Sequence, residues 1–174
     1  MYNQTNSDNE YKSIVGDILS HEEFVDSMKS LKHHDSNRLE HSLKVSYCAY
    51  KIAKTLRLDY AEVARGGLLH DYYFDSVCDQ KNIKDKVFLY TLNHPKDALE
   101  NARNTFGVTD KEADIIRSHM FPLDISVPKY AESWIVNAVD TCISTKEFSN
   151  KFKTEIAYAT NLLVIFVINM VRIG

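Results

Sequence analysis

The residues of this chain that could do chemistry are six potential metal ligands, four histidines and two aspartates. In chain order they are His41, the adjacent pair His70 and Asp71, His94, His119 and Asp140. Imidazole and carboxylate ligands without a thiolate suit iron, manganese or zinc, and six ligands exceed what one open catalytic metal takes from protein. The set predicts a two-metal hydrolytic centre, although a histidine taken alone at a helix end is usually a cap or a surface group, and an aspartate alone could be a cap or a buried acceptor.

Helix signals surround these ligands, whereas strand signals are rare. One face of the helix expected over residues 37–56 carries Arg38, His41, Val45, Ala49, Ile52 and Leu56. The other helices are expected at about 20–31, 59–71, 95–106, 109–119, 131–143 and 154–172. The sequence therefore predicts an all-α fold, a bundle of about six to eight helices.

Local signals set the expected boundaries of these helices. The predicted N-terminal caps are Ser20 with Glu23, Asp59 with Glu62, and Thr109 with Glu112. Pro95 is expected at the first position of its helix and Gly107 just past the end. Periodicity is weak from Tyr72 to Asn93, so we expect a long loop that could contain one short helix, of the kind that often forms a lid.

Two features predict how the helices pack. Gly66 and Gly67 lower helix propensity just before the His-Asp pair, which indicates that a neighbouring helix or a ligand approaches the backbone there. A second apolar stripe, with Asp140 at its side, is expected to face the core; its members are Ala131, Trp134, Ile135, Ala138, Val139, Cys142 and Ile143.

Composition bounds the classes of protein to be considered. The 174 residues are 44% hydrophobic and 26% charged, as expected of one globular domain, which we place at residues 21–174 after a polar lead-in at 1–20. The net charge of −3 excludes general attraction to nucleic acid polymers or anionic membranes. The polar first ten residues carry no signal sequence, and three scattered cysteines indicate reduced, core-packed thiols, so we expect a cytoplasmic protein.

The apolar run from Leu162 to Ile168 is the most hydrophobic segment of the chain. It is much shorter than the roughly 20 residues that a membrane-spanning helix needs, so no membrane role is expected. The run either closes the core or packs against a second subunit. In the second case the protein would be a homodimer.

Several strings of this sequence resemble the HD superfamily of metal-dependent phosphohydrolases. They are Arg38-Leu-Glu-His41-Ser42, Gly66-Gly-Leu-Leu-His70-Asp71, Asn93-His94-Pro95, Ser118-His119-Met120 and Val139-Asp140. The ordered set is similar to the binuclear branch, which includes HD-GYP cyclic dinucleotide phosphodiesterases and symmetrical diadenosine tetraphosphate hydrolases. The chain lacks the Gly-Tyr-Pro extension, which counts against a true HD-GYP enzyme.

The resemblance implies a ligand set and cofactors. His41, His70, Asp71 and Asp140 would bind one divalent metal, and Asp71, His94 and His119 would bind the other, with Asp71 bridging the two. Iron or manganese is favoured, and zinc, nickel or magnesium are alternatives. Arg38 matches an arginine that often precedes the first family histidine, so it is a candidate catalytic and phosphate-binding group, or else a helix-start arginine paired with an acid.

The chain departs from the family where many relatives place a lysine after the His-Asp pair. Here Tyr72, Tyr73, Phe74 and Asp75 follow instead. Lys96 or Lys129 could replace the missing cation in binding substrate, or Asp75 could act as a proton donor if burial raised its pKa. The aromatic residues, Tyr72 among them, are expected either to stack a nucleobase or to fill the core.

Together these patterns predict an enzyme, a metal-dependent phosphohydrolase that cleaves a phosphate ester or anhydride of a small nucleotide-like substrate with a water activated by two metals. The alternative is a degenerate HD domain that binds a nucleotide or a protein partner without turnover. A purely structural helical module would bind no stoichiometric metal.

Overall fold

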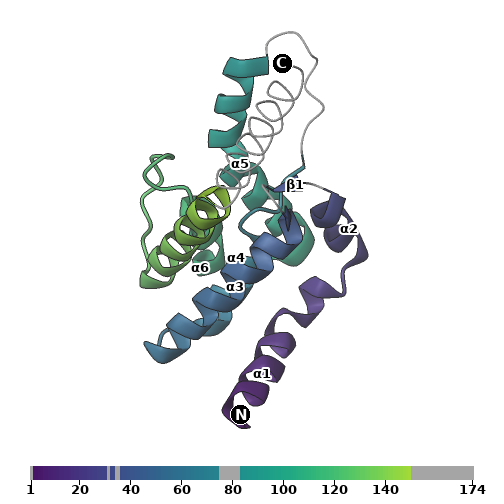
Figure 1. The fold of residues 1–174 in the computed structure, drawn as a ribbon, viewed down its shortest axis with the longest axis vertical. Coiled ribbons are helices and arrows are strands. Elements are labelled where there is room, and N and C mark those ends of the chain that lie inside the picture. Colours follow the sequence, from purple (N-terminus) through teal and green to yellow (C-terminus); the bar gives the residue numbers. More distant parts are fainter. Residues whose placement is uncertain (1, 31, 34–35, 75–82, 150–174) are drawn as a thin grey trace, which may run out of the picture.

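The computed structural model describes residues 2–30, 32–33, 36–74 and 83–149. The chain forms helices α1 (Tyr2–Leu19), α2 (Glu22–Ser30), α3 (Arg38–Thr55), α4 (Tyr60–Leu69), α5 (Ile83–Phe106) and α6 (Asp110–Ser118), and residues 131–149 are also helical (Figure 1). Between α2 and α3, β1 (Lys32–His33) pairs antiparallel with β2 (Ser36–Asn37). The all-α prediction is confirmed. The helix predicted at 154–172, the run from Leu162 to Ile168, Cys78 and Asp75 lie outside the described residues.

Side-chain caps fix the starts of the helices that later carry the site. Asn37 accepts a hydrogen bond from the Glu40 main-chain N–H at the start of α3. Asp59 caps α4, and Thr109 forms a capping box with Glu112 at the start of α6. The last two caps confirm the sequence prediction, because a side-chain oxygen that satisfies the orphan N–H groups of a first turn depends only on local sequence.

Helix α4 packs between α3 and α6 with little space on either side. A Cβ atom at Gly66 would lie 2.9 Å from Ile115 Cγ2 on α6, and one at Gly67 would lie 3.1 Å from the Cα atom of Ser46 on α3. The close approach predicted from these glycines is therefore confirmed, and it is made by neighbouring helices. It brings the end of α4, where the His-Asp pair follows, against both partners.

We expect Gly66→Ala to lower the free energy of unfolding by about 1–3 kcal/mol, because the added methyl group overlaps Ile115 in a packed interior. Gly16→Ala on α1 is the matched control, since nothing lies within 4 Å of its Cβ position. That variant should gain roughly 0.5–1 kcal/mol from helix propensity. Urea denaturation measures both, and equal gains in the two variants would contradict the tight contact.

The larger core cluster joins α1 and α2 to the helices that carry the site. Tyr11, Val15 and Ile18 of α1 are buried in it together with Leu68 of α4 and Ala102 of α5. No helix was predicted before residue 20, so α1 is an addition to the predicted architecture. Its apolar residues are spaced four and three apart in a polar segment, and tertiary packing covers them. The domain division at residue 20 stays a prediction.

Two details of α2 and α3 differ from the sequence prediction. His21 Nδ1 accepts from the Phe24 main-chain N–H, whereas the Ser20 hydroxyl donates to the Asp17 carbonyl, so the capping box predicted at Ser20 is wrong. On α3, Ile52 and Leu56 are exposed although the predicted apolar face included them. At this end of α3 the buried face carries Tyr50 and Ala53 instead.

Helix α5 contradicts the loop predicted through residue 93. It begins at Ile83, and Pro95 lies inside it instead of at its first position. A proline within a helix removes one main-chain hydrogen bond. For this reason the sequence pattern predicted Pro95 at the start of a helix. The end of the helix is as predicted, since Gly107 follows with a φ of 62°.

The helix of residues 131–149 buries a different face from the predicted one. Ala131, Trp134, Ala138 and Cys142 are exposed. The buried face carries Glu132, Ser133, Val136, Asn137, Val139 and Asp140. This face is polar because it makes hydrogen bonds to other segments, which the hydrophobic pattern cannot reveal.

Two of the cysteines are more exposed than the sequence predicted. Cys48 and Cys142 are both exposed, so the expected core packing of these thiols is wrong. Each lies on the outer face of a helix whose opposite side is buried. Among the described helices, none combines the length and hydropathy that crossing a membrane requires.

Candidate metal centre

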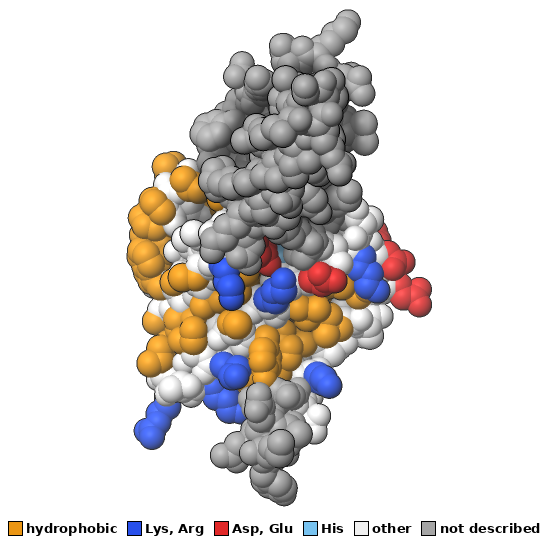
Figure 2. All heavy atoms as spheres, in the orientation of Figure 1, with side chains coloured by type: hydrophobic (Ala, Val, Ile, Leu, Met, Phe, Trp, Pro, Cys, Tyr) orange, Lys and Arg blue, Asp and Glu red, His pale blue; other side chains and the backbone are white. Residues whose placement is uncertain are grey.

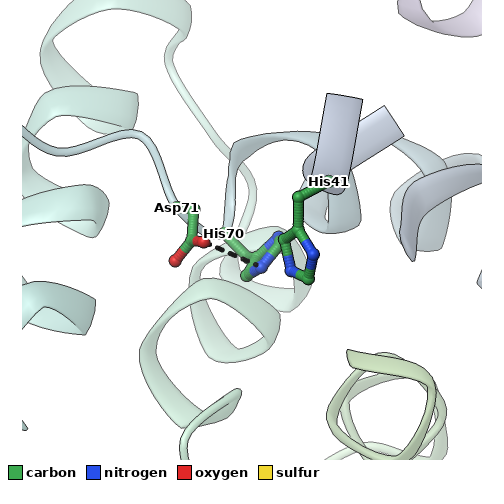
Figure 3. Close-up of side chains that lie close together, drawn as sticks. All are labelled: His41, His70 and Asp71. Carbon is green, nitrogen blue, oxygen red and sulfur yellow. Dashed lines mark ion pairs between the residues drawn. The ribbon is translucent and has the colours of Figure 1, made fainter. Parts of the chain in front are cut away.

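Five separate segments bring the six predicted ligands together in the interior. His41 lies in the first turns of α3, His70 and Asp71 follow the end of α4, and His94 lies within α5. His119 caps α6, and Asp140 comes from the helix of residues 131–149. All six side chains are buried. Figure 3 shows His41 approaching the His-Asp pair from α3, with the ion pair between His70 and Asp71 drawn as a dashed line.

Asp71 stands at the middle of this cluster. Its Oδ1 lies 3.3 Å from His94 Nε2 and 3.7 Å from His119 Nε2, and its Oδ2 lies 3.5 Å from His70 Nε2. On the other side, Asp140 Oδ1 lies 3.0 Å from His41 Nε2 and 3.9 Å from His70 Nε2. Asp71 thus lies near His70, His94 and His119, Asp140 lies near His41 and His70, and His70 is close to both carboxylates.

Backbone carbonyls set the tautomers of two histidines. His70 Nδ1 donates to the Gly67 carbonyl and His119 Nδ1 to the Ile116 carbonyl, each at 2.8 Å. Because a carbonyl oxygen only accepts, each neutral ring keeps the lone pair of Nε2 for the centre of the cluster. His70 Nε2 is buried and makes no hydrogen bond to any described residue. A buried lone pair of this kind is what a metal ligand requires.

The electrostatics favour two ionised carboxylates. Burial alone raises the pKa of Asp71, but the charges of His70, His94 and His119 and the hydrogen bond from His94 outweigh it and hold that pKa well below its usual value. Burial likewise raises the pKa of Asp140, and the hydrogen bond with His41 together with neighbouring histidine charges lowers it overall. Negative charge therefore persists in a buried site, which suits a cation.

The histidines divide into two kinds. Burial first, and then the charges of His70 and His94, lower the pKa of His119 to about 3, so this ring is neutral and available as a ligand across the ordinary pH range. Burial also lowers the pKa of His41, but its hydrogen bond to Asp140 and the charges of Asp71, Asp140 and Glu147 outweigh burial and raise that pKa. His41 is thus the ring whose charged form the two aspartates favour.

The donor set fits divalent cations. Ligand atoms within 4.8 Å of one another form three overlapping groups, which are His41 with His70 and Asp71, His70 with His119 and Asp140, and Asp71 with His94 and His119. His70, Asp71 and His119 each belong to two of these groups, so the three groups are not independent sites for three cations. Four imidazoles and two carboxylates without a thiolate suit iron, manganese or zinc.

Glu147 is a neighbour of the cluster that sequence reasoning missed. Its Oε2 lies 3.2 Å from His41 Nδ1, and its Oε1 accepts from Lys44 Nζ at 3.0 Å. Glu147 lies seven residues after Asp140, two helical turns along the same face. That spacing was the available signal, since it aligns a second carboxylate with a ligand already identified.

A cavity of about 520 Å³ opens onto the cluster. Asp71, His94, His119 and Asp140 are at its polar end. One wall is mainly apolar and consists of Tyr73, Met120, Phe121, Pro122 and Leu123. Another part of the lining carries the hydroxyl groups of Thr141, Ser144 and Thr145. The cavity therefore combines the ligand cluster with two chemically different surfaces.

The loop of the apolar wall also reaches the outer surface. Leu123, Ile125 and Val127 are exposed. Hydrophobic side chains gather along the left edge of Figure 2, over the loop that Figure 1 draws in green. The loop after His119 thus contributes side chains both to the cavity and to the outside of the molecule.

The guanidinium of Arg38 packs against Tyr73, and the role of Arg38 in binding phosphate stays a prediction. Its Nη1 donates to the Tyr73 carbonyl at 2.7 Å, and its Cζ lies 3.7 Å from the centroid of the Tyr73 ring. The ring of Tyr73 also lies 4.7 Å from that of His94. Arg38 therefore holds a residue of the cavity wall, because Tyr73, one of the three aromatic residues after the His-Asp pair, lines the cavity.

The other predicted substrate groups lie away from the cavity. Tyr72 is only 2% exposed and packs edge-on against Phe24 in the core, so of the two expectations the core-filling one describes it. Lys96 lines a separate depression with Arg103 and Arg117. Lys129 lines another depression, and its main-chain N–H donates to Asp114. The structure thus does not bring Tyr72, Lys96 or Lys129 to the ligand cluster.

The fold and the cluster define a helical protein with a buried histidine and aspartate centre. A family model described as HD domain matches residues 38–145, from the start of α3 to just past Asp140. The chain therefore belongs to the HD domain family, whose members are generally metal-dependent phosphohydrolases. Comparisons with curated proteins and with solved structures found no match.

Proposed function

We propose that this protein is a metal-dependent phosphohydrolase that uses two divalent cations to hydrolyse a small phosphate ester. The observation that carries the proposal is the convergence of four histidines and two aspartates from five segments, four of which, Asp71, His94, His119 and Asp140, line a cavity of about 520 Å³. His41, His70, Asp71 and Asp140 would hold one cation. Asp71, His94 and His119 would hold the other.

Bound there, two divalent cations supply Lewis acidity, which lowers the pKa of water and neutralises charge on phosphoryl oxygens. The protein supplies position. Gly67 and Ile116 orient His70 and His119 through their carbonyls, and Asn137 holds the segment after His119 by donating to the His119 and Phe121 carbonyls. Asp71, in reach of three histidines, is the group that links the two halves of the site.

The cavity walls support a small substrate with a flat organic part and a hydroxyl-bearing part. Thr141 Oγ1 donates to the Asn137 carbonyl and Thr145 Oγ1 to the Thr141 carbonyl, while Ser144 Oγ donates to Asp140 Oδ1. Because these acceptors carry no proton, the hydroxyl oxygens keep lone pairs for donors on a ligand. Sugar hydroxyls or a base amino group suit that wall, and the Tyr73 side suits a base ring.

The experiment that tests the proposal is elemental analysis of the purified, unchelated protein followed by a hydrolysis screen. We expect about two metals per chain. The protein loaded with iron or manganese should hydrolyse nucleotides or other small phosphate esters. One metal per chain would point to a mononuclear centre with His94 and His119 facing substrate. No metal after reconstitution would contradict the proposal.

We expect Tyr73→Ala to raise KM about 10-fold, because stacking of a base on an aromatic side chain is worth about 1–3 kcal/mol. Tyr73→Phe keeps the ring and should keep KM. Lys96→Ala is the control, since Lys96 lies outside the cavity. Steady-state kinetics on the substrate found in the screen decides, and a KM that responds to Lys96 but not to Tyr73 would contradict this wall assignment.

One observation favours a second candidate, an HD domain that binds a nucleotide or a protein partner without turnover. No lysine or arginine is among the described residues that line the cavity, and Arg38 is engaged with Tyr73. Hydrolases that act on phosphate groups commonly add such a cation. Tight nucleotide binding by the metal-loaded protein, with no product in single-turnover assays, would support this candidate over the hydrolase.

A further inference from the structure

We propose that Glu147 is a positioning residue of the metal centre, which fixes the tautomer and orientation of His41 so that Nε2 faces the cations. The inference rests on the proposed two-metal function and assigns a role to a residue outside the ligand set. Glu147 lies beyond residue 145, where the match to the family model ends. The match to the family model therefore assigns no role to Glu147.

The His41 ring is held between two carboxylates of one helix. Nε2 lies 3.0 Å from Asp140 Oδ1, and Nδ1 lies 3.2 Å from Glu147 Oε2. The ring is fully buried and the Glu147 side chain is 12% exposed, so water competes little for the contact. In the neutral ring, a carboxylate that accepts from Nδ1–H leaves Nε2 without a proton, which is the form that binds a metal.

Helix geometry explains why His41 needs a side chain for this purpose. His70 and His119 directly follow the ends of α4 and α6, and their Nδ1 groups donate to Gly67 and Ile116 in the last turns of those helices. Carbonyls of a last turn lack helical donors and are free to accept. His41 lies near the start of α3, where the carbonyls accept within the helix, so its Nδ1 has to find an acceptor elsewhere.

Lys44 completes the arrangement one turn after His41. Its Nζ lies 3.0 Å from Glu147 Oε1, so the two oxygens of one carboxylate are held by two residues of α3. The Lys44 side chain is half exposed, and exposed ion pairs contribute little. The buried contact with His41 is therefore the one that carries the effect on the metal centre.

The test is Glu147→Gln, an isosteric change whose amide can either accept from or donate to Nδ1 and so no longer imposes one tautomer. Metal content after dialysis and dissociation constants from calorimetry are measured on the full chain with manganese. We expect the affinity for one of the two metals to fall about 10- to 100-fold, as for other partners of metal-bound histidines. The second metal should bind as in the wild type.

Glu132→Gln is the matched control. Glu132 is a buried glutamate on the same helix, but it accepts from Lys111 and from the Asp59 main-chain N–H, and neither partner is a predicted metal ligand. It should keep both metals at unchanged affinity. Circular dichroism establishes that both variants remain folded, a readout that separates positioning from structural damage.

The outcomes separate this inference from the function on which it rests. A wild type that binds two metals, together with a Glu147→Gln protein that binds both at wild-type affinity, would overturn the positioning role and leave the hydrolase proposal standing. Equal losses in Glu147→Gln and Glu132→Gln would also overturn it, since any change on this helix would then weaken the site. A wild type without metal would overturn both proposals.

Discussion

Asp71→Ala is expected to remove both metals and to reduce hydrolysis to background, while the helical content stays close to that of the wild type. Asp71 is the carboxylate that approaches His70, His94 and His119 together, at 3.3 to 3.7 Å. Its loss removes a ligand from each half of the proposed site and takes a close carboxylate away from three buried imidazoles. Elemental analysis, hydrolysis and circular dichroism measure the three quantities.

Asp114→Ala serves as the control for this experiment. Asp114 is an aspartate of α6 that accepts from the Ser133 hydroxyl and the Lys129 main-chain N–H, outside the ligand cluster. It should lower stability modestly, by about 1 kcal/mol for each lost hydrogen bond, and keep both metals. An Asp71→Ala protein with full metal content and full turnover would refute the proposed function.

The ligand cluster was predictable because its signals are local in sequence. His41 and His119 lie on helices whose faces and caps follow from side-chain type and spacing, as Thr109 illustrates. The adjacent glycines before His70 indicated a close helix contact, and Ile115 provides it. The geometry of the cluster then follows from packing α4 between two helices, which burial of apolar faces favours.

Features that depend on distant partners were not predictable. From the sequence, Arg38 was an equally good candidate for a phosphate clamp or for an ion pair. Its hydrogen bond to the Tyr73 carbonyl could not be predicted, because the two residues are far apart in the chain. Tyr72 and Tyr73 are adjacent and chemically identical, yet one fills the core and the other lines the cavity. Only the path of the chain after α4 decides between them.

The buried face of the helix of residues 131–149 also depends on distant partners. Asn137 and Ser133 are buried because the His119 carbonyl and the Asp114 carboxylate are their partners. A pattern of apolar residues assumes that burial follows hydrophobicity, and it placed Trp134 inside for that reason. Where a helix supports a polar site, hydrogen bonds decide the orientation instead.

Chelating the metals is expected to lower the melting temperature of the wild type by about 10 °C or more. The ligands come from α3, the end of α4, α5, the end of α6 and the helix of residues 131–149, so bound cations would cross-link five segments. A site at 1,000 times its dissociation constant contributes about 4 kcal/mol to stability. For a domain of this size each kcal/mol corresponds to roughly 2–4 °C.

The Asp71→Ala protein distinguishes a specific effect from a general one. If the centre holds cations through Asp71, the melting temperature of this variant should not respond to chelator or to added manganese, whereas the wild type responds to both. A wild type whose melting temperature is the same with and without bound metal would contradict a structural contribution from the centre. The unsatisfied Nε2 of buried His70 argues that the apo form carries a penalty which metal binding removes.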